Sequence, residues 1–261
     1  MSVSSVNKYL NRAASVFTFA VKNGYMDKNP AFGMGIKQPK RVDQLRDVFS
    51  PDDLRRLFFS EEYVGDAHRS SYRFWVPVIG LFSGMRLEEI CQLHLSDIRQ
   101  ETGIWVFDIN NTREKNIKTP SSLRLVPLHR ILTDDLHLPE YAESLRQQGH
   151  DRLFRELQAR REGYSQTVSK WFGRYRQRCG IVVAEGRKDF HSFRHSVADA
   201  LKQAGVEPTM IAELLGHEVP SITMGRYGKR YNPKVLFDNA ISKLKFDVDL
   251  SHLSASKYIS R

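Results

Sequence analysis

Residues 189–195 have the sequence Asp-Phe-His-Ser-Phe-Arg-His, and they open a stretch whose apolar residues recur at helical spacing. The apolar residues from Phe193 onward fall on one side of such a helix, while His191, Arg194 and His195 fall on or beside the other. Three neighbouring donors that face away from a core suit a phosphate group. The alternative interpretation is an ordinary solvated helix face.

The same stretch contains a His-x-x-x-His spacing, which makes a zinc site a second interpretation. Metalloproteases with the His-Glu-x-x-His motif place their general base directly after the first histidine. Here Ser192 occupies that position, and the motif contains no carboxylate to replace it. The sequence therefore predicts neither a bound metal nor another cofactor, and it disfavours a metal hydrolase.

Downstream, a second predicted helix at 208–215 ends at Gly216, a natural C-terminal cap, with His217 immediately beyond. A rigid helix end can present a histidine for catalysis, although such a histidine often only interacts with the helix dipole. Tyr227 follows ten residues later within Gly-Arg-Tyr-Gly-Lys-Arg, between cations and glycines, where a core role is implausible. A phenol needs proton removal or nearby positive charge to act as a nucleophile. Tyr231 is a rival in the same segment.

Upstream, two further cations are candidates for the same chemistry. Arg86 stands at a predicted helix start, and Glu89, three residues on, lies on the same face and could orient its guanidinium. The alternative is a surface ion pair. Lys118 lies in a predicted hairpin just before Arg-x-Val-Pro-Leu, although Lys115 is close by and a lysine in a turn is usually only solvated.

The periodicity along the chain predicts a mainly α protein with a small antiparallel β-sheet, an α+β fold. Ser50 followed by Pro51 and two aspartates is a strong helix start, and helical patterns continue to about residue 99 with an interruption at Ser83 and Gly84. The short apolar stretches within residues 103–129 predict the small sheet, with a basic hairpin. Other helices are predicted at 5–22, 165–178, 190–204, 208–215 and 233–245.

The amino-acid composition indicates what kind of molecule the protein binds. The 261 residues carry a formal charge of +10 and a pI near 9.6, which favours a polyanion, most commonly nucleic acid. Two cysteines are too few for a disulfide framework or a cysteine zinc site. No apolar run is long enough to span a bilayer, and the N-terminus does not resemble a secretory signal. We expect a cytoplasmic protein that associates with DNA rather than with a membrane.

Taken in order, these motifs resemble the tyrosine recombinase (phage integrase) family. The order is Gly-x-Arg-x-x-Glu at 84–89, a hairpin lysine before Arg-x-Val-Pro-Leu at 118–128, His-x-x-Arg-His at 191–195, Leu-Leu-Gly-His at 214–217, and then Tyr227. Each motif alone is weak, but the ordered set is specific. The resemblance covers about residues 1–245, because helix 5–22 resembles the end of the family's core-binding domain.

The resemblance implies a role for each residue. Arg86, Arg194 and His217 would donate to the scissile phosphate, and His191 would be the general base for the nucleophile Tyr227. Lys118 would protonate the 5′-oxygen leaving group. The secondary orienting residues would be Glu89 and His195. Tyr227 would hold a 3′-phosphotyrosine until an incoming 5′-hydroxyl displaces it, so rejoining would need neither ATP nor metal.

The resemblance also implies an organisation and a setting. Residues 1–46 would be the last helix of a truncated core-binding domain plus a linker, 47–245 the catalytic domain, and 246–261 a C-terminal tail. The partner would be double-stranded DNA, bound as a homotetramer, with a monomer or weak dimer in its absence. The tail would exchange between protomers. The expected role is integration or excision of a mobile element such as a prophage, close to the nucleoid.

Two other functions remain as alternatives. A DNA-binding regulator without catalysis could use helix 165–178, whose Lys170, Arg174 and Arg178 would face phosphates. Such a protein would not need the two arginines, the histidines and Tyr227 together. A type IB topoisomerase uses similar chemistry but relaxes supercoils, so strand exchange between two duplexes would distinguish the recombinase from it.

Overall fold

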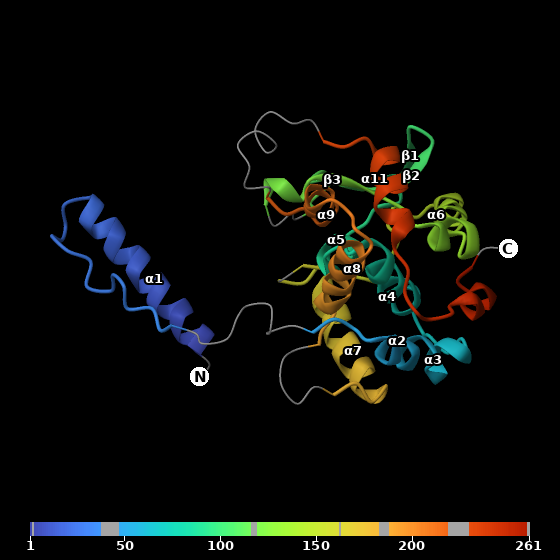
Figure 1. The fold of residues 1–261 in the computed structure, drawn as a ribbon, viewed down its shortest axis with the longest axis horizontal. Helices are drawn as coiled ribbons and strands as arrows, with labels where there is room; N and C mark the ends of the chain where they lie inside the picture. Colours follow the sequence, from blue (N-terminus) through green and yellow to red (C-terminus); the bar gives the residue numbers. More distant parts are fainter. Residues whose placement is uncertain are drawn as a thin grey trace. The chain divides into compact units, whose positions relative to one another are not determined.

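The computed structural model comprises two compact units, Met1–Leu45 and Arg46–Arg261, each of which is described here by itself (Figure 1). Two of the predicted catalytic residues, Lys118 and Tyr227, lie outside the described residues. The structure describes residues 1, 3–37, 47–115, 119–161, 163–182, 188–218 and 230–259.

The first unit consists of helix α1 (Val3–Lys22) and a segment that returns along it. The Asn7 side chain forms two hydrogen bonds with the backbone of Ile36, donating to its carbonyl and accepting from its amide, each at 2.9 Å. Asn29 donates to the carbonyl of Ala14 at 3.0 Å. The segment up to Ile36, which we expected to be a linker, is therefore held on α1, because asparagine side chains satisfy backbone groups that a free linker would leave to water.

The predicted helix starts and ends in the second unit are largely confirmed. Ser50 and Asp53 form a reciprocal capping box, with hydrogen bonds of 3.1 and 2.8 Å between side chains and backbone amides. The predicted helices at 165–178 and 208–215 have those bounds. The helices in the described residues of this unit are α2 (Pro51–Phe58), α3 (Glu61–Val64), α4 (Ser71–Ser83), α5 (Leu87–Cys91), α6 (Leu138–Gln147), α7 (Ser165–Arg178), α8 (His191–Gln203), α9 (Pro208–Leu215) and α11 (Pro233–Asn239).

Two helices differ from the prediction. Helix α6 was missed, although Leu138, Ala142 and Leu145 give its buried face an i, i+4, i+7 spacing. The last helix ends at Asn239 rather than near 245, because Ala240 leaves the helical conformation and a 3₁₀ turn, η5 (Ile241–Lys243), follows. Further turns of this kind are η2 (Leu95–Asp97), η3 (Pro120–Ser122) and η6 (Ser251–Ala255), with a π-helical turn at η4 (Ile131–Asp135).

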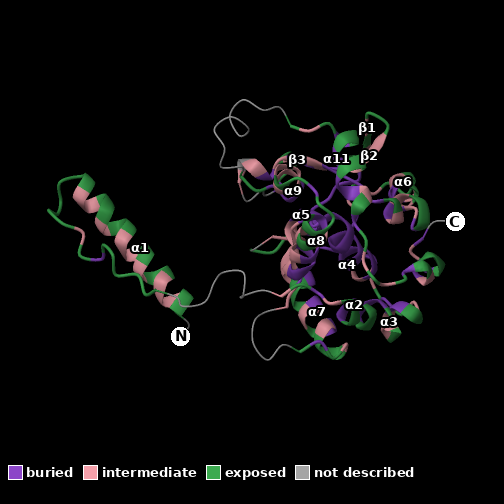
Figure 2. Ribbon diagram, in the orientation of Figure 1, coloured by how far each residue is buried: buried purple, intermediate pink, exposed green. Residues whose placement is uncertain are grey.

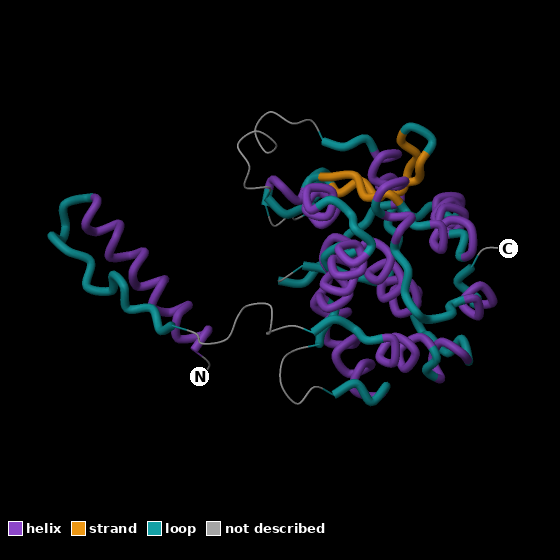
Figure 3. Tube along the Cα trace, in the orientation of Figure 1, coloured by secondary structure: helices purple, strands orange, loops and turns teal. Residues whose placement is uncertain are grey.

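The predicted small antiparallel sheet is confirmed, with one more strand than the sequence indicated (Figure 3). Its strands lie in the order β1 (Ile98–Glu101), β2 (Ile104–Ile109) and β3 (Arg124–Pro127). We had assigned β1 to the end of a helical stretch. Its four residues are a strand because β2 pairs with them, Ile98 opposite Phe107. Helices α9 and α11 contact β3.

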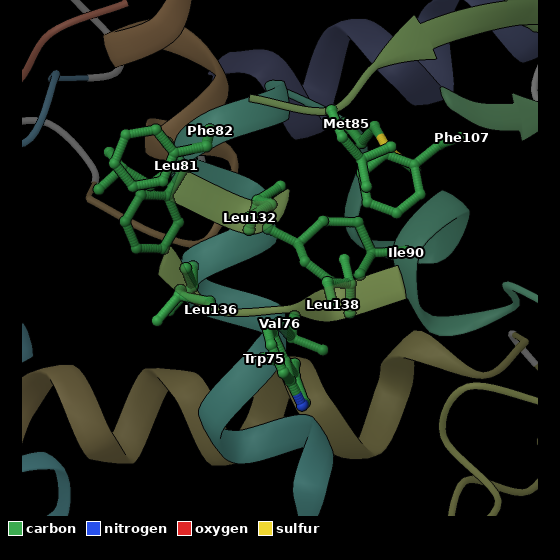
Figure 4. Close-up of a cluster of buried hydrophobic side chains, with 14 of the residues drawn as sticks. Trp75, Val76, Leu81, Phe82, Met85, Ile90, Phe107, Leu132, Leu136 and Leu138 are labelled. Atoms are coloured by element: carbon green, nitrogen blue, oxygen red, sulfur yellow. The ribbon is translucent and has the colours of Figure 1, made fainter. Parts of the chain in front are cut away.

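Helix α4 is the centre of the hydrophobic core, and nearly all of its residues are buried (Figure 2). Trp75 is the largest fully buried side chain on it. Leu132 of the π-helical turn, Ile90 of α5 and Phe107 of β2 are gathered around the same helix (Figure 4). The core therefore joins the sheet, the short helices and α4 into one body.

A close backbone approach at the end of α4 brings three segments together. Gly84 caps the helix in the left-handed conformation, with φ of 63°. A Cβ at this position would lie 2.7 Å from a methyl group of Leu215 and 3.0 Å from one of Val197. Only glycine fits, so the loop that carries Arg86 packs directly against α8 and α9.

The C-terminal segment packs on the unit from which it emerges. Leu250, Leu253 and Ile259 are buried in the same core. The Tyr258 hydroxyl donates to the carbonyl of His68 at 2.8 Å, and Ser256 donates to the Asp66 carboxylate at 2.7 Å. The described part of the tail is thus built into its own fold.

This packing predicts that Leu253→Ala lowers the free energy of unfolding by about 2–5 kcal/mol, the range for truncating a buried leucine. Ser254→Ala is the matched control, because Ser254 is exposed beside it. Urea unfolding followed by circular dichroism measures both. Equal stability of the two variants would show that the tail is not part of the core.

Candidate active site

Arg194 lies at the centre of the candidate site, and its environment differs from the expected one. We predicted a donor that faces away from the core, but only 3% of the residue is exposed. Its guanidinium donates to the carbonyls of Gly84, at 3.0 Å, and Leu215, and to Nε2 of His217 at 2.8 Å. Carbonyls at the ends of α4 and α9 hold this cation inside the fold, because both helices pack against α8.

Arg86 reaches the same place from the start of α5. Its Nη1 donates to Glu89 at 2.7 Å and to the Ser122 hydroxyl at 3.2 Å, and its Nη2 donates to the Gly216 carbonyl at 3.1 Å. The side chain is 19% exposed, so this is not the surface ion pair of the alternative interpretation. Arg86 and Arg194 thus donate to the neighbouring carbonyls of Gly216 and Leu215.

Glu89 orients Arg86, as its spacing predicted, and it has a second partner. Its carboxylate is 4% exposed and also accepts from both terminal nitrogens of Arg124, at 3.1 and 2.8 Å. Burial alone would raise the pKa of Glu89, but hydrogen bonds from Arg124 and Arg86 outweigh it and lower the pKa to about 2. The carboxylate is therefore ionised at any pH where the protein works.

His217 stands immediately beyond the left-handed Gly216 at the end of α9, as the sequence predicted. A guanidinium has donors only, so Nε2 of His217 must accept from Arg194, and a neutral ring then carries its proton on Nδ1. Partial desolvation and the charges of Arg194 and Arg86 lower the pKa of this histidine to about 4. His217 is thus a neutral donor at an exposed position.

The remaining motif histidines share one face of α8. The rings of His191 and His195 lie 5.2 Å apart, centroid to centroid, at 68° to one another. Both are half-exposed, and the His191 amide donates to the Asp189 carboxylate at 2.9 Å. The helix therefore places a potential base one turn before Arg194, with a second imidazole beside it.

The charges gathered here favour an anion. The guanidinium groups of Arg86 and Arg124 both pair with the carboxylate of Glu89, and the guanidinium of Arg194 lies close enough to feel the charges of all three. Burial and the charges of Arg86 and Arg124 lower the pKa of Arg194, which shows that the site is electropositive. Oxygens of a phosphodiester would relieve this repulsion.

The structure shows the contacts of two rival candidates, Lys115 for the catalytic lysine and Tyr231 for the nucleophile. Lys115 is buried and its ammonium group is paired with the Asp97 carboxylate at 2.7 Å. The Tyr231 hydroxyl hydrogen-bonds to Thr209 at 3.0 Å, at the beginning of α9, whereas His217 follows its end. A helix of eight residues is about 12 Å long, so this hydroxyl is held far from the arginines.

The predicted DNA-contacting face of α7 is exposed at Lys170 and Arg174. Arg178 is exposed as well, but it is paired with Glu62 at 2.7 Å. The amides of Tyr164 and Ser165 at the start of the helix both donate to Glu88, at 2.8 Å each. The α7 N-terminus is therefore already neutralised, and any contact with DNA falls to its side chains.

Sequence analysis missed two residues that join these segments, Arg124 and Ser122. Both are buried, and both contact Arg86 or its partner Glu89. Arg124 belongs to the Arg-x-Val-Pro-Leu motif, which we used only to locate the hairpin. An arginine opening a buried strand was the available signal, because such a charge requires a partner.

Within the part of the chain that the structure describes, no three His, Cys, Asp or Glu side chains lie together as a metal site would require. No helix in the described ranges is both long and apolar enough to cross a membrane.

Comparison with known proteins identifies the family. The phage integrase family model matches residues 45–232, and the chain belongs to this family, as its motifs predicted. The XerA tyrosine recombinase of Thermococcus kodakarensis is 32% identical over 190 residues, 72% of this chain and 60% of that protein. The putative defective protein IntQ of Escherichia coli is 25% identical over 253 residues, 87% of this chain and 60% of that protein.

Solved structures support the fold. A lambda integrase dimer bound to a core site superposes with a TM-score of 0.58 at 19% identity, covering 87% of this chain and 59% of that one. The integrase of mycobacterium phage Brujita covers the whole of this chain, with a TM-score of 0.51. The predicted integrase catalytic fold is confirmed. The chain spans about 60% of the length of both curated relatives.

The geometry of His217 predicts its titration. Its folded-state pKa of about 4 lies below the ordinary 6.5, so the ring stays neutral down to about pH 5 and gains a proton only below that. NMR of the histidine rings measures the midpoint, and His217→Gln identifies the resonance. Added inorganic sulfate should raise the midpoint, because an anion offsets the arginine charges. A midpoint near 6.5 without sulfate would contradict the contact with Arg194.

Proposed function

We propose that this chain is the catalytic part of a site-specific DNA recombinase, which cuts and rejoins strands through a covalent bond to Tyr227. The observation that carries the proposal is the meeting of Arg86, Arg194 and His217 at the ends of α4 and α9. Two buried or half-buried guanidinium groups and a neutral imidazole are suited to a phosphodiester and to the extra charge of its transition state.

The arginines keep donors for such a ligand. A guanidinium has five N–H groups, and the bonds described above for Arg86 and for Arg194 engage three in each. The other two N–H groups of each guanidinium can donate to the non-bridging oxygens of the scissile phosphate, and Nδ1–H of His217 can add another donor. Because these cations are held by the fold, little reorganisation is needed when charge develops.

The chemical step is a transesterification. The Tyr227 oxygen attacks the phosphorus, its proton passes to His191, and the bond to the 5′-oxygen breaks as Lys118 protonates that oxygen. The products are a 3′-phosphotyrosine and a free 5′-hydroxyl. A 5′-hydroxyl of the partner strand then reverses the step, so the ester bond is retained and no ATP is consumed.

The rival residues support these assignments by exclusion. Tyr231 is tied to Thr209 and Glu207 at the beginning of α9, and Lys115 is neutralised by Asp97 inside the fold. Neither can reach the arginines without breaking these contacts. Tyr227 is the remaining tyrosine candidate, and Lys118 is the remaining lysine candidate. Tyr227 follows His217 and Lys118 precedes Arg124, which is the order typical of the family.

Double-stranded DNA is the proposed substrate, with a homotetramer as the active assembly. The positive charge of the chain supports the partner. A lambda integrase tetramer bound to a Holliday junction is among the structures with the same fold. We further propose that residues 1–46 end a core-binding domain, since Tyr9, Val16 and Phe19 on α1 are each more than 60% exposed and suit helical neighbours. Mobile-element integration or excision is the proposed role.

The nucleophile assignment predicts that Tyr227→Phe abolishes covalent attachment to DNA, while Tyr231→Phe retains it. Both variants should bind DNA as the wild type does, because a single hydroxyl is lost. The measurement uses genomic fragments of the source organism that carry random nicks. Where a nick lies close to the cleaved bond, the short strand with the 5′-hydroxyl diffuses away, so the strand cannot be rejoined and the adduct persists. Detergent-resistant complexes are then counted on gels. Loss of adduct in Tyr231→Phe alone would overturn the assignment.

The arginine clamp predicts that Arg86→Ala slows adduct formation by on the order of 10²–10³, the scale for losing one preorganised donor. Arg56→Ala is the control, because Arg56 forms an exposed ion pair within α2. The rate should not change in excess EDTA. Strict dependence on a divalent ion, or equal rates for the two variants, would contradict the mechanism.

A further inference from the structure

We propose that Arg124 is a positioning residue of the phosphate site, which fixes Arg86 through Glu89 and anchors the end of α9 that presents His217. The inference rests on the proposed function, since it assigns a role within that site. Arg124 opens strand β3 and is not one of the proposed reacting groups.

The first observation is the two-sided grip on Glu89. Each carboxylate oxygen accepts from Arg124 and also from Arg86: Oε1 from both side chains, and Oε2 from the Arg124 side chain and the Arg86 amide. A carboxylate held at both oxygens cannot rotate. Arg124 therefore helps to fix the carboxylate that orients the Arg86 guanidinium.

The second observation concerns the turn before His217. Arg124 Nε donates to the Leu214 carbonyl at 2.7 Å. A Cβ on Gly216 would lie 2.9 Å from Nη1 of Arg124 and 3.2 Å from its Cζ, so the turn rests directly on the guanidinium plane. Arg124 therefore supports the same backbone whose next carbonyls receive Arg194 and Arg86.

The third observation is a link to the hairpin. Nη1 of Arg124 donates to the Ser122 carbonyl at 2.8 Å, and the Ser122 hydroxyl accepts from Arg86 at 3.2 Å. With 1% of its side chain exposed, Arg124 itself is out of reach of a ligand. One guanidinium thus joins α5, β3 and α9, and it acts on the phosphate only through the residues it holds.

A purely structural ion pair is the alternative, and it would affect stability alone. The experiment measures inorganic sulfate binding to the full chain by NMR, following the Nε–H signals of Arg86 and Arg194. Arg124→Lys keeps the charge but loses the fork. Arg146→Lys is the matched control, because Arg146 also donates to two carbonyls and pairs with a carboxylate, away from the site.

We expect Arg124→Lys to weaken sulfate binding about tenfold, the scale of one charged hydrogen bond, with no change in Arg146→Lys. Arg124→Met should also raise the titration midpoint of His217, because a nearby positive charge is lost. A folded Arg124→Lys that binds sulfate as the wild type does would overturn the proposal. Absence of sulfate binding at Arg86 and Arg194 in the wild type would instead refute the phosphate site itself.

If Arg124→Lys does not fold, the double variant Glu89→Gln/Arg124→Met replaces it. This variant removes both members of the buried charge pair, which costs less than leaving one of them alone. It is compared with Glu89→Gln, in which Arg124 is intact. The proposal requires weaker sulfate binding in the double variant, and equal affinity would overturn it.

Discussion

The Glu89 carboxylate, buried between the guanidinium groups of Arg86 and Arg124, is the interaction on which the geometry of the site depends. Unpaired, either a carboxylate or a guanidinium in this position would be costly to bury. Together they leave a net positive charge, and they fix Arg86 beside the carbonyls to which Arg194 also donates. The fold thus holds cations close together before any ligand neutralises them, which is what an electrostatic catalyst of phosphate chemistry needs.

Close backbone packing makes this arrangement possible. Gly84 and Gly216 both adopt the left-handed conformation, and a side chain on either would collide with the neighbouring segment. Their absence of side chains lets the ends of α4 and α9 expose carbonyls to the arginines. The same packing joins the candidate site to the core around α4, so a displacement of its residues is resisted by the whole unit.

Local patterns in the sequence predicted much of this fold but not its long-range contacts. Helices with a clear periodicity of apolar residues, such as those at 165–178 and 208–215, were predicted with their bounds. Strand β1 was missed because only its pairing with β2 makes it a strand. Likewise, motif order identified Arg194 as a candidate, whereas its burial depends on carbonyls that are distant in sequence. The position of Arg124 at the start of a buried strand indicated that it needs a partner, but nothing local in the sequence identified Glu89 as that partner.

The most direct test of the central claim is a crystal structure of this chain with orthovanadate, which imitates a phosphoryl group in transition. The account predicts vanadate oxygens within hydrogen-bond distance of Arg86, Arg194 and His217, with Glu89 still held between Arg86 and Arg124. Vanadate bound elsewhere on the basic surface, with Arg86 and Arg194 keeping only their contacts within the protein, would contradict it.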